Sequence, residues 1–314
     1  MNNVRPTPLW RSGDLLLTDG GLETTLVFHN GLDLPDFAAF PLLSDGFGRE
    51  VLRDYYRRYV HIARRHGLDI VLDTPTWRAS ADWGARLGYD AQRLRAVNGE
   101  AVDLVRGIGA ECTEVRVLVS GNVGPRGDGY QVGTRMSAAQ AEDYHRPQIA
   151  ALARAGADLI TVLTMTYPEE VIGVARAARS EKASIAVGFT VETDGRHPSG
   201  HTLADAVATV DAATDGYPLH YGINCAHPDH FRSALGADPW TARLGLLRAN
   251  ASRASHAELD EATELDAGDP TELAEQYAAL RDLLPNLTVL GGCCGTDHRH
   301  IAAVAMACAG GRSA

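Results

Sequence analysis

Long apolar segments are absent from this 314-residue sequence. No run reaches the roughly 18 apolar residues of a membrane-spanning helix, so we expect no segment inside a membrane. Residues 1–14 also have no apolar centre of the kind found in signal peptides. We therefore expect a cytoplasmic protein, in which thiols stay reduced. The five cysteines then serve as packing, metal-binding or reactive groups rather than as a disulfide framework.

Positive charge is scarce. The chain has 29 lysines and arginines against 40 aspartates and glutamates, which gives a formal net charge of −11 at pH 7. Nucleic-acid binding needs clustered positive charge, and because the sequence has no such cluster we expect no nucleic-acid partner. Hydrophobic residues make up 45% of the chain and charged residues 22%. This is an ordinary globular composition in a chain long enough for a large core, which excludes general disorder.

Long linkers and low-complexity tracts are also absent, and short β-branched segments instead alternate with amphipathic ones. The expected strands are residues 15–21, 70–76, 115–123, 159–165, 184–191, 219–225, 245–250 and 287–292. The clearest helical patterns between and after them are residues 50–66, 137–155, 271–284 and 297–309. Eight strand–helix units predict an α/β fold, a single (β/α)₈ TIM barrel. The alternative, an open doubly wound sheet, usually has fewer units, and no Gly-x-Gly-x-x-Gly motif follows the first strand.

Three of the five cysteines lie where expected strands end. The sixth strand ends at Cys225, and the last runs through two glycines into Cys293 and Cys294. In a barrel, the ends of the strands carry the chemistry. Adjacent residues of a regular strand point to opposite faces, but the surrounding glycines free the backbone so that both cysteines reach one ion. Three thiolates suit Zn²⁺, and three protein ligands with a fourth position open are typical of a catalytic zinc site.

Other interpretations of the cysteines remain open at this point. Cys112 and Cys308 are expected to be packing residues, since a lone cysteine is usually a small buried apolar group. Cys293 and Cys294 form a dithiol redox centre in a second interpretation, although such pairs are normally spaced Cys-x-x-Cys. A third is a non-catalytic zinc-binding or thiol-binding barrel, whose fourth ligand comes from one of four nearby histidines: His227, His230, His298 and His300.

Five motifs, taken in order along the chain, resemble the zinc-dependent homocysteine S-methyltransferase family. They are Asp19-Gly20-Gly21, residues 74–80, Val123-Gly124-Pro125, Asn224-Cys225 and residues 291–295. The resemblance implies one barrel domain over residues 1–314, with residues 1–13 as an N-terminal extension. It also implies one Zn²⁺ held by Cys225, Cys293 and Cys294, through which these residues are catalytic. No oligomeric state follows from the sequence.

The resemblance implies methyl transfer to the zinc-activated thiol of homocysteine, giving methionine, as in methionine biosynthesis. Both partners are then small molecules, a thiol acceptor and a methyl donor. One barrel uses up the chain, which leaves no cobalamin or folate module, so a sulfonium donor, S-methylmethionine or S-adenosylmethionine, is expected. Relatives bind the amino acid with residues that match Asp19, Gly20 and Thr74, and Asn224 belongs to the same binding set. Trp77 lies near the position of a ring that contacts the donor, although simple packing at the rim would also explain it.

Two departures from the family pattern bear on the substrates. Arg78 stands where betaine-using relatives have an aromatic residue, which argues against betaine. Leu163 stands where relatives have a glutamate that pairs with the homocysteine ammonium. We therefore expect Glu192, at the end of the fifth strand, to hold this ammonium together with Asp19, unless Glu192 is a solvated residue paired with Arg196. The departure also leaves open a different thiol or selenol acceptor.

Overall fold

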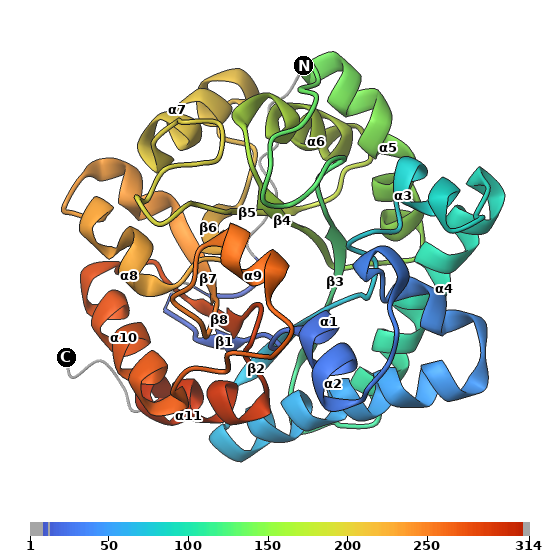
Figure 1. Ribbon diagram of the computed structural model, residues 1–314, viewed down its shortest axis with the longest axis horizontal. Helices are drawn as coiled ribbons and strands as arrows, with labels where there is room; N and C mark the ends of the chain where they lie inside the picture. The colour runs from blue at the N-terminus through green and yellow to red at the C-terminus, as the bar shows by residue number, and fades with distance from the viewer. Residues whose placement is uncertain (1–8, 12, 310–314) are drawn as a thin grey trace.

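Eight parallel strands close into a barrel in the computed structural model, which describes residues 9–11 and 13–309 (Figure 1). The strands pair in chain order, and β1 also pairs with β8. They are β1 (Leu16–Leu17), β2 (Asp69–Asp73), β3 (Val117–Val123), β4 (Leu159–Met165), β5 (Ile185–Phe189), β6 (His220–Asn224), β7 (Leu244–Ala249) and β8 (Val289–Gly292). The predicted (β/α)₈ barrel is confirmed, and the open doubly wound sheet is excluded.

Helices surround the strands, and Figure 1 shows α1 and α9 inside this ring, close to the strands. The α-helices are α1 (Leu22–Thr24), α2 (Gly46–His66), α3 (Ala81–Arg86), α4 (Ala91–Ala110), α5 (Ala138–Arg154), α6 (Pro168–Ser180), α7 (Leu203–Thr214), α8 (Pro228–Phe231), α9 (His256–Glu261), α10 (Pro270–Leu283) and α11 (His298–Ala309). All four helices named from the sequence are present. Their ends follow local capping: Ser137 and Gln140 form a capping box at α5, and Asp45 starts α2 by accepting a hydrogen bond from the Gly48 N–H.

The core has two parts, as a barrel requires. The larger lies between strands and helices, and the smaller fills the barrel with one or two side chains from most strands, among them Leu16, Val71 and Leu246. Most of the predicted extension, residues 1–8 and 12, lies outside the described residues. Within the described part, Trp10 packs against the inner cluster, its ring 5.6 Å from that of His220 at the start of β6. No helix in the described ranges is both long and apolar enough to cross a membrane.

Candidate active site

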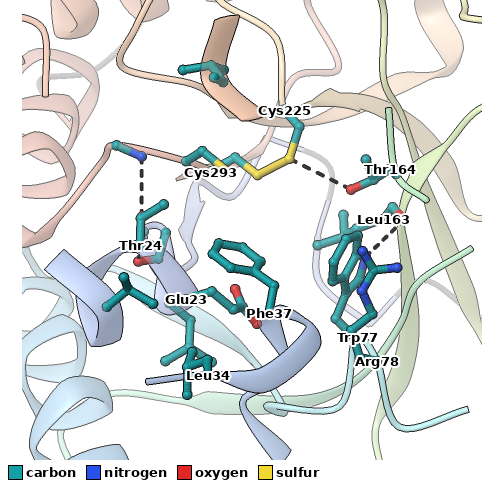
Figure 2. Close-up of a pocket in the computed structure, with 18 of the residues that line it drawn as sticks. Glu23, Thr24, Leu34, Phe37, Trp77, Arg78, Leu163, Thr164, Cys225 and Cys293 are labelled. Carbon is teal, nitrogen blue, oxygen red and sulfur yellow. Dashed lines mark hydrogen bonds between the residues drawn. A yellow bond between two sulfur atoms is a disulfide. The ribbon is translucent and has the colours of Figure 1, made fainter. Parts of the chain in front are cut away.

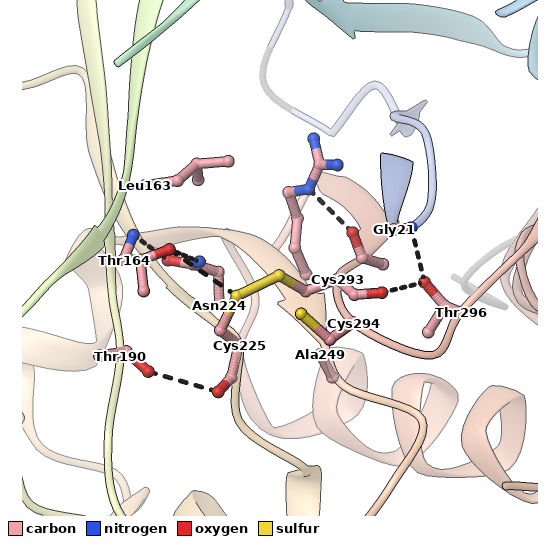
Figure 3. The surroundings of a disulfide bond; sticks show 12 residues. Gly21, Leu163, Thr164, Thr190, Asn224, Cys225, Ala249, Cys293, Cys294 and Thr296 are labelled. Carbon is pink, nitrogen blue, oxygen red and sulfur yellow. Dashed lines mark hydrogen bonds between the residues drawn. A yellow bond between two sulfur atoms is a disulfide. The ribbon is translucent and has the colours of Figure 1, made fainter. Parts of the chain in front are cut away.

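Three cysteine sulfur atoms meet at the carboxyl ends of β6 and β8 (Figure 3). The Sγ atoms of Cys225, Cys293 and Cys294 all lie within 4.8 Å of one another. Cys225 and Cys293 are joined by a disulfide, whereas Cys294 carries a free thiol. Reduction of that disulfide by two electrons yields three thiols at one point of the rim. The structure thus brings together the three residues that the sequence predicts to act together.

Strand β7 fixes both cysteine loops, because it lies between β6 and β8. The Cys225 N–H donates to the Arg248 carbonyl at 3.1 Å, and the Cys293 N–H donates to the Ala249 carbonyl at 2.9 Å. Cys225 itself has a left-handed backbone, with φ of 54°. This conformation costs on the order of 1–3 kcal/mol for a residue other than glycine, and such strain is concentrated at functional sites. These backbone hydrogen bonds and the Cys225–Cys293 disulfide together hold the two cysteine loops side by side.

The donor set fits a thiophilic metal with an open coordination position. Among the described residues, the only group of three or more potential metal ligands within 4.8 Å is these three cysteines, with no histidine. Three of the candidate histidines bind elsewhere: His227 accepts from the Asp229 N–H, His230 pairs with the Arg253 carbonyl, and His300 pairs with the Ala267 carbonyl. Within residues 9–11 and 13–309, no fourth protein ligand joins the three sulfur atoms to complete a closed structural site.

A cavity of about 600 Å³ opens directly over the cysteines (Figure 2). Of the side chains predicted to bind substrate, Asp19, Thr74, Trp77 and Asn224 line it, together with Gly20 and Leu163. Glu192 is not among the lining residues. The structure therefore gathers all but one of the predicted substrate residues around a single chamber.

Asp19 is buried, and both of its carboxylate oxygens have protein partners. Its Oδ1 lies 2.8 Å from Nη2 of Arg248 on β7, and its Oδ2 accepts a hydrogen bond from the Tyr55 hydroxyl at 3.0 Å. Arg248 also donates to Asp73 and to the carbonyls of Gly20 and Gly292. Burial raises the pKa of Asp73 to about 6 even though the guanidinium opposes the shift. The sequence reasoning missed Arg248, although a lone arginine in an otherwise apolar strand is a signal for a buried ion pair.

Thr74 and Asn224 are also held by protein groups. Thr74 Oγ1 lies 2.7 Å from Thr76 Oγ1 and accepts from the Asn122 N–H at 3.0 Å. The Asn224 amide binds Thr164 twice, accepting from its N–H and donating to its hydroxyl, each at 2.9 Å. The Thr164 hydroxyl in turn lies 3.7 Å from Cys225 Sγ. Asn224 thus aligns the end of β4 with the cysteines.

Trp77 lines the cavity, but one of its faces already holds a cation. The Arg78 guanidinium lies 4.2 Å from the centroid of the Trp77 ring and 3.6 Å from that of Trp83. The indole N–H of Trp77 donates to the Leu163 carbonyl at 3.4 Å. A cationic ligand in the cavity can therefore reach only the opposite face or the edge of this ring.

Glu192 lies away from the cavity and pairs with a histidine. Its Oε1 is 3.1 Å from Nδ1 of His256, whose Nε2 lies 2.8 Å from the Cys225 carbonyl. Arg196 contacts Glu192 only through the backbone, where its carbonyl accepts from the Glu192 N–H. The structure thus places Glu192 next to the Cys225 loop and outside the cavity that Asp19, Thr74 and Asn224 line.

Tyr130 is a site residue that the sequence reasoning missed. It belongs to the loop between β3 and α5, its hydroxyl lies 3.5 Å from Cys294 Sγ, and its ring stacks on His256 with a centroid separation of 4.0 Å. Burial raises the pKa of Tyr130 well above its ordinary value, so the phenol stays protonated. It is therefore available as a hydrogen-bond donor to a cysteine sulfur.

Comparison with known proteins places these features in one family. The sequence model of the homocysteine S-methyltransferase family matches residues 16–308. A homocysteine S-methyltransferase of Escherichia coli K12 is 29% identical over 313 residues, which cover 93% of this chain and 94% of the relative. Homocysteine S-methyltransferase 1 of Arabidopsis thaliana is 23% identical and covers 72% of both chains. Among crystal structures, the metallated form of the E. coli homocysteine methyltransferase MmuM superposes with a TM-score of 0.74, at 25% identity, over 93% of this chain and 96% of that one.

Proposed function

The chain belongs to the homocysteine S-methyltransferase family, and on that premise we propose that it transfers a methyl group from a sulfonium donor to the thiol of homocysteine, giving methionine. We propose further that Cys225, Cys293 and Cys294 hold one Zn²⁺. The observation that carries the proposal is the meeting of three cysteine sulfur atoms under a cavity, with no fourth protein ligand in the cluster among the described residues.

The cysteines prepare the site for a nucleophilic sulfur. Zinc, when bound, lowers the pKa of a coordinating thiol, which would otherwise be mostly protonated at pH 7 because a free thiol has a pKa near 8.5. The three cysteine thiolates carry one negative charge more than a divalent ion neutralises, so the site stays electron-rich. The acceptor thiol gives up its proton to solvent, and its sulfur forms a bond to the methyl carbon while the donor's carbon–sulfur bond breaks. The electron pair of the broken bond stays on the donor sulfur, which becomes a neutral thioether.

The charge of the cavity favours a cationic donor. Nine carboxylate side chains line the cavity, against three guanidinium groups. A concave surface lined mainly by one charge concentrates ligands of the opposite charge. This supports a sulfonium such as S-methylmethionine or S-adenosylmethionine, and it disfavours an anionic donor such as a folate.

Trp77→Ala tests the donor side of the cavity. A cation–ring contact contributes about 0.5–2 kcal/mol, so the donor KM should rise several-fold to tens-fold while the KM for homocysteine changes less. Trp83→Ala is the matched control, since it also removes a ring from Arg78 but leaves Trp77 in place. Steady-state kinetics with each substrate varied in turn give both constants. Equal effects of the two variants would assign the change to Arg78 and count against a donor contact.

Tyr130→Phe tests the hydrogen bond to Cys294. Partners that hydrogen-bond to metal ligands typically affect metal affinity by about 10–100-fold, and for this long contact we expect about a tenfold loss of zinc affinity. Competition with a chelator measures the affinity. Tyr144→Phe is the control, because it removes a hydroxyl that binds Ser80 instead. Equal zinc affinities of Tyr130→Phe and the wild type would show that this hydroxyl does not support the ligand.

A substrate panel tests the function itself. Reduced, zinc-loaded protein is incubated with thiols and a selenol on one side and methyl donors on the other, and the products are identified by mass. We expect methionine from homocysteine with a sulfonium donor. Faster methylation of another thiol or selenol would show that this compound, and not homocysteine, is the acceptor. Zinc binding without any methyl transfer would favour a non-catalytic thiol-binding barrel.

A further inference from the structure

A thiol amino acid brings an ammonium group into the cavity, and Leu163, Asp19 and Glu192 leave this group without a partner. An ammonium that leaves water needs a carboxylate to offset its lost hydration. Leu163 is apolar. Asp19 is engaged by Arg248 and Tyr55, and Glu192 pairs with His256 outside the cavity.

Glu23 is a cavity carboxylate with no side-chain hydrogen bond or ion pair among the described residues, although burial and the charge of Asp19 raise its pKa and the charges of Arg248 and Arg78 lower it. It is the second residue of α1, it is half-buried, and it lines the cavity. Its carboxylate accepts a hydrogen bond from its own backbone N–H, and across residues 9–11 and 13–309 no side chain binds it. Figure 2 shows the carboxylate beside the Phe37 ring, on the side of the cavity that faces Cys293.

The start of α1 is fastened to the cysteine loop, which fixes Glu23 relative to the sulfur atoms. The Gly21 N–H donates to the Thr296 carbonyl at 3.0 Å, and the Gly295 N–H donates to the Thr24 hydroxyl at 3.3 Å. The two backbones approach so closely that a β-carbon on Gly21 would lie 2.5 Å from the Cys293 carbonyl oxygen. Glu23 therefore stands at a defined position beside the metal-binding cysteines.

The other carboxylates of the cavity differ from Glu23 in being either paired or exposed to solvent. Asp73 pairs with Arg248 and Asp36 with Arg86, and the exposed ones are Asp33, Asp128, Asp260, Glu264 and Asp266.

We propose that Glu23 binds the ammonium group of the acceptor amino acid and so determines that the enzyme selects an amino-acid thiol over a simple thiol. The inference rests on the proposed function, because it takes the acceptor thiol to lie at the three cysteines. Homocysteine carries its ammonium a short aliphatic chain away from its sulfur, so one molecule can contact the cysteines and a neighbouring carboxylate. Burial raises the pKa of Glu23 to about 7, and an ammonium beside it stabilises the ionised form.

Binding measurements on Glu23→Gln test the assignment. Glutamine keeps the shape of the side chain and removes its charge. Calorimetry with reduced, zinc-loaded protein compares homocysteine with 4-mercaptobutanoate, which is the same thiol acid without the amino group. We expect the Kd of homocysteine to rise about 10–100-fold, the range for a lost charged hydrogen bond. The Kd of 4-mercaptobutanoate and the zinc content should stay unchanged. Glu261→Gln, an exposed carboxylate at the end of α9, is the control and should match the wild type.

The outcomes separate this inference from the proposed function. If the wild type prefers homocysteine and Glu23→Gln keeps that preference, the assignment of Glu23 is wrong while the function stands. If Glu23→Gln weakens both thiols equally, the residue supports the site generally and does not recognise the ammonium. If the wild type binds homocysteine no better than 4-mercaptobutanoate, both the homocysteine acceptor and the role of Glu23 are overturned.

Discussion

Replacement of Cys225, Cys293 or Cys294 by serine, one at a time, is expected to abolish zinc binding and to reduce methyl transfer to background. The three sulfur atoms lie within 4.8 Å of one another, and the cluster contains no other ligand among the described residues. A serine hydroxyl is a poor substitute because it stays protonated at neutral pH, whereas a thiol on zinc is deprotonated. The zinc content, measured by elemental analysis of reduced protein, should fall from about one per chain towards zero.

Cys112→Ser is the control for these variants. Cys112 is a free, half-buried cysteine outside the metal-binding group. This variant should keep both its zinc and its activity. A cluster variant that retained full zinc content and full turnover would contradict the metal site.

Arg248→Met is expected to destabilise the fold strongly. Arg248 is buried and serves two buried carboxylates, those of Asp19 and Asp73, as well as the carbonyls of Gly20 and Gly292. Breaking a buried ion pair by removal of one partner costs about 3–5 kcal/mol, because the other partner is left charged and unpaired. For a chain of this size that corresponds to a fall in Tm on the order of 10 °C. Denaturant unfolding at pH 8 measures the loss.

The pH dependence of this loss has a definite sign. The pKa of Asp73 is already raised to about 6 by burial, and loss of the guanidinium raises it further. A carboxyl whose pKa is raised in the folded state binds a proton more readily there than in the unfolded state. The destabilisation caused by its buried charge therefore disappears as the pH falls through that pKa. The loss in Arg248→Met should therefore be smaller at pH 5 than at pH 8.

Arg253→Met provides the control for Arg248→Met. Arg253 also pairs with two carboxylates, those of Asp229 and Glu272, but about half of its side chain is exposed, so its replacement should cost about 1 kcal/mol or less. An unfolding free energy of Arg248→Met close to that of the wild type would mean that the buried carboxylates do not depend on this guanidinium.

The sequence predicted the fold well because local patterns dominate in a (β/α)₈ barrel. Each strand is a short apolar run, and each predicted helix follows an amphipathic pattern with a recognisable end. The main difference lies at the first strand, expected at residues 15–21 but ordered as a strand only over Leu16–Leu17. Beyond Leu17 the chain still bonds to β8, because the Thr18 N–H donates to the Leu290 carbonyl and the Asp19 carbonyl accepts from the Gly292 N–H. It then turns through Gly20 and Gly21 into α1.

The residues that the family resemblance implied, among them Asp19, Thr74 and Asn224, line the cavity. The residues alone predicted a site only where groups of one kind cluster at strand ends. The cysteines satisfied that condition. Glu192 lies just beyond β5, which ends at Phe189 rather than at residue 191. Neighbouring positions on a rim do not fix where a side chain points, and this one pairs with His256. Tyr130 lies on a loop without periodicity, 164 residues from the Cys294 that it contacts. Glu23 stands out because its carboxylate has no side-chain hydrogen bond or ion pair among the described residues. A sequence cannot reveal this, because it depends on which partners the neighbouring side chains take.

The most direct test of the zinc-dependent mechanism is removal and return of the metal in the reduced enzyme. Methionine formation from homocysteine and S-methylmethionine is followed before chelation, after it, and during titration with zinc. We expect activity to fall to background without metal and to return in proportion to zinc, reaching a plateau at about one ion per chain. Full activity in the reduced, zinc-free protein would contradict the mechanism.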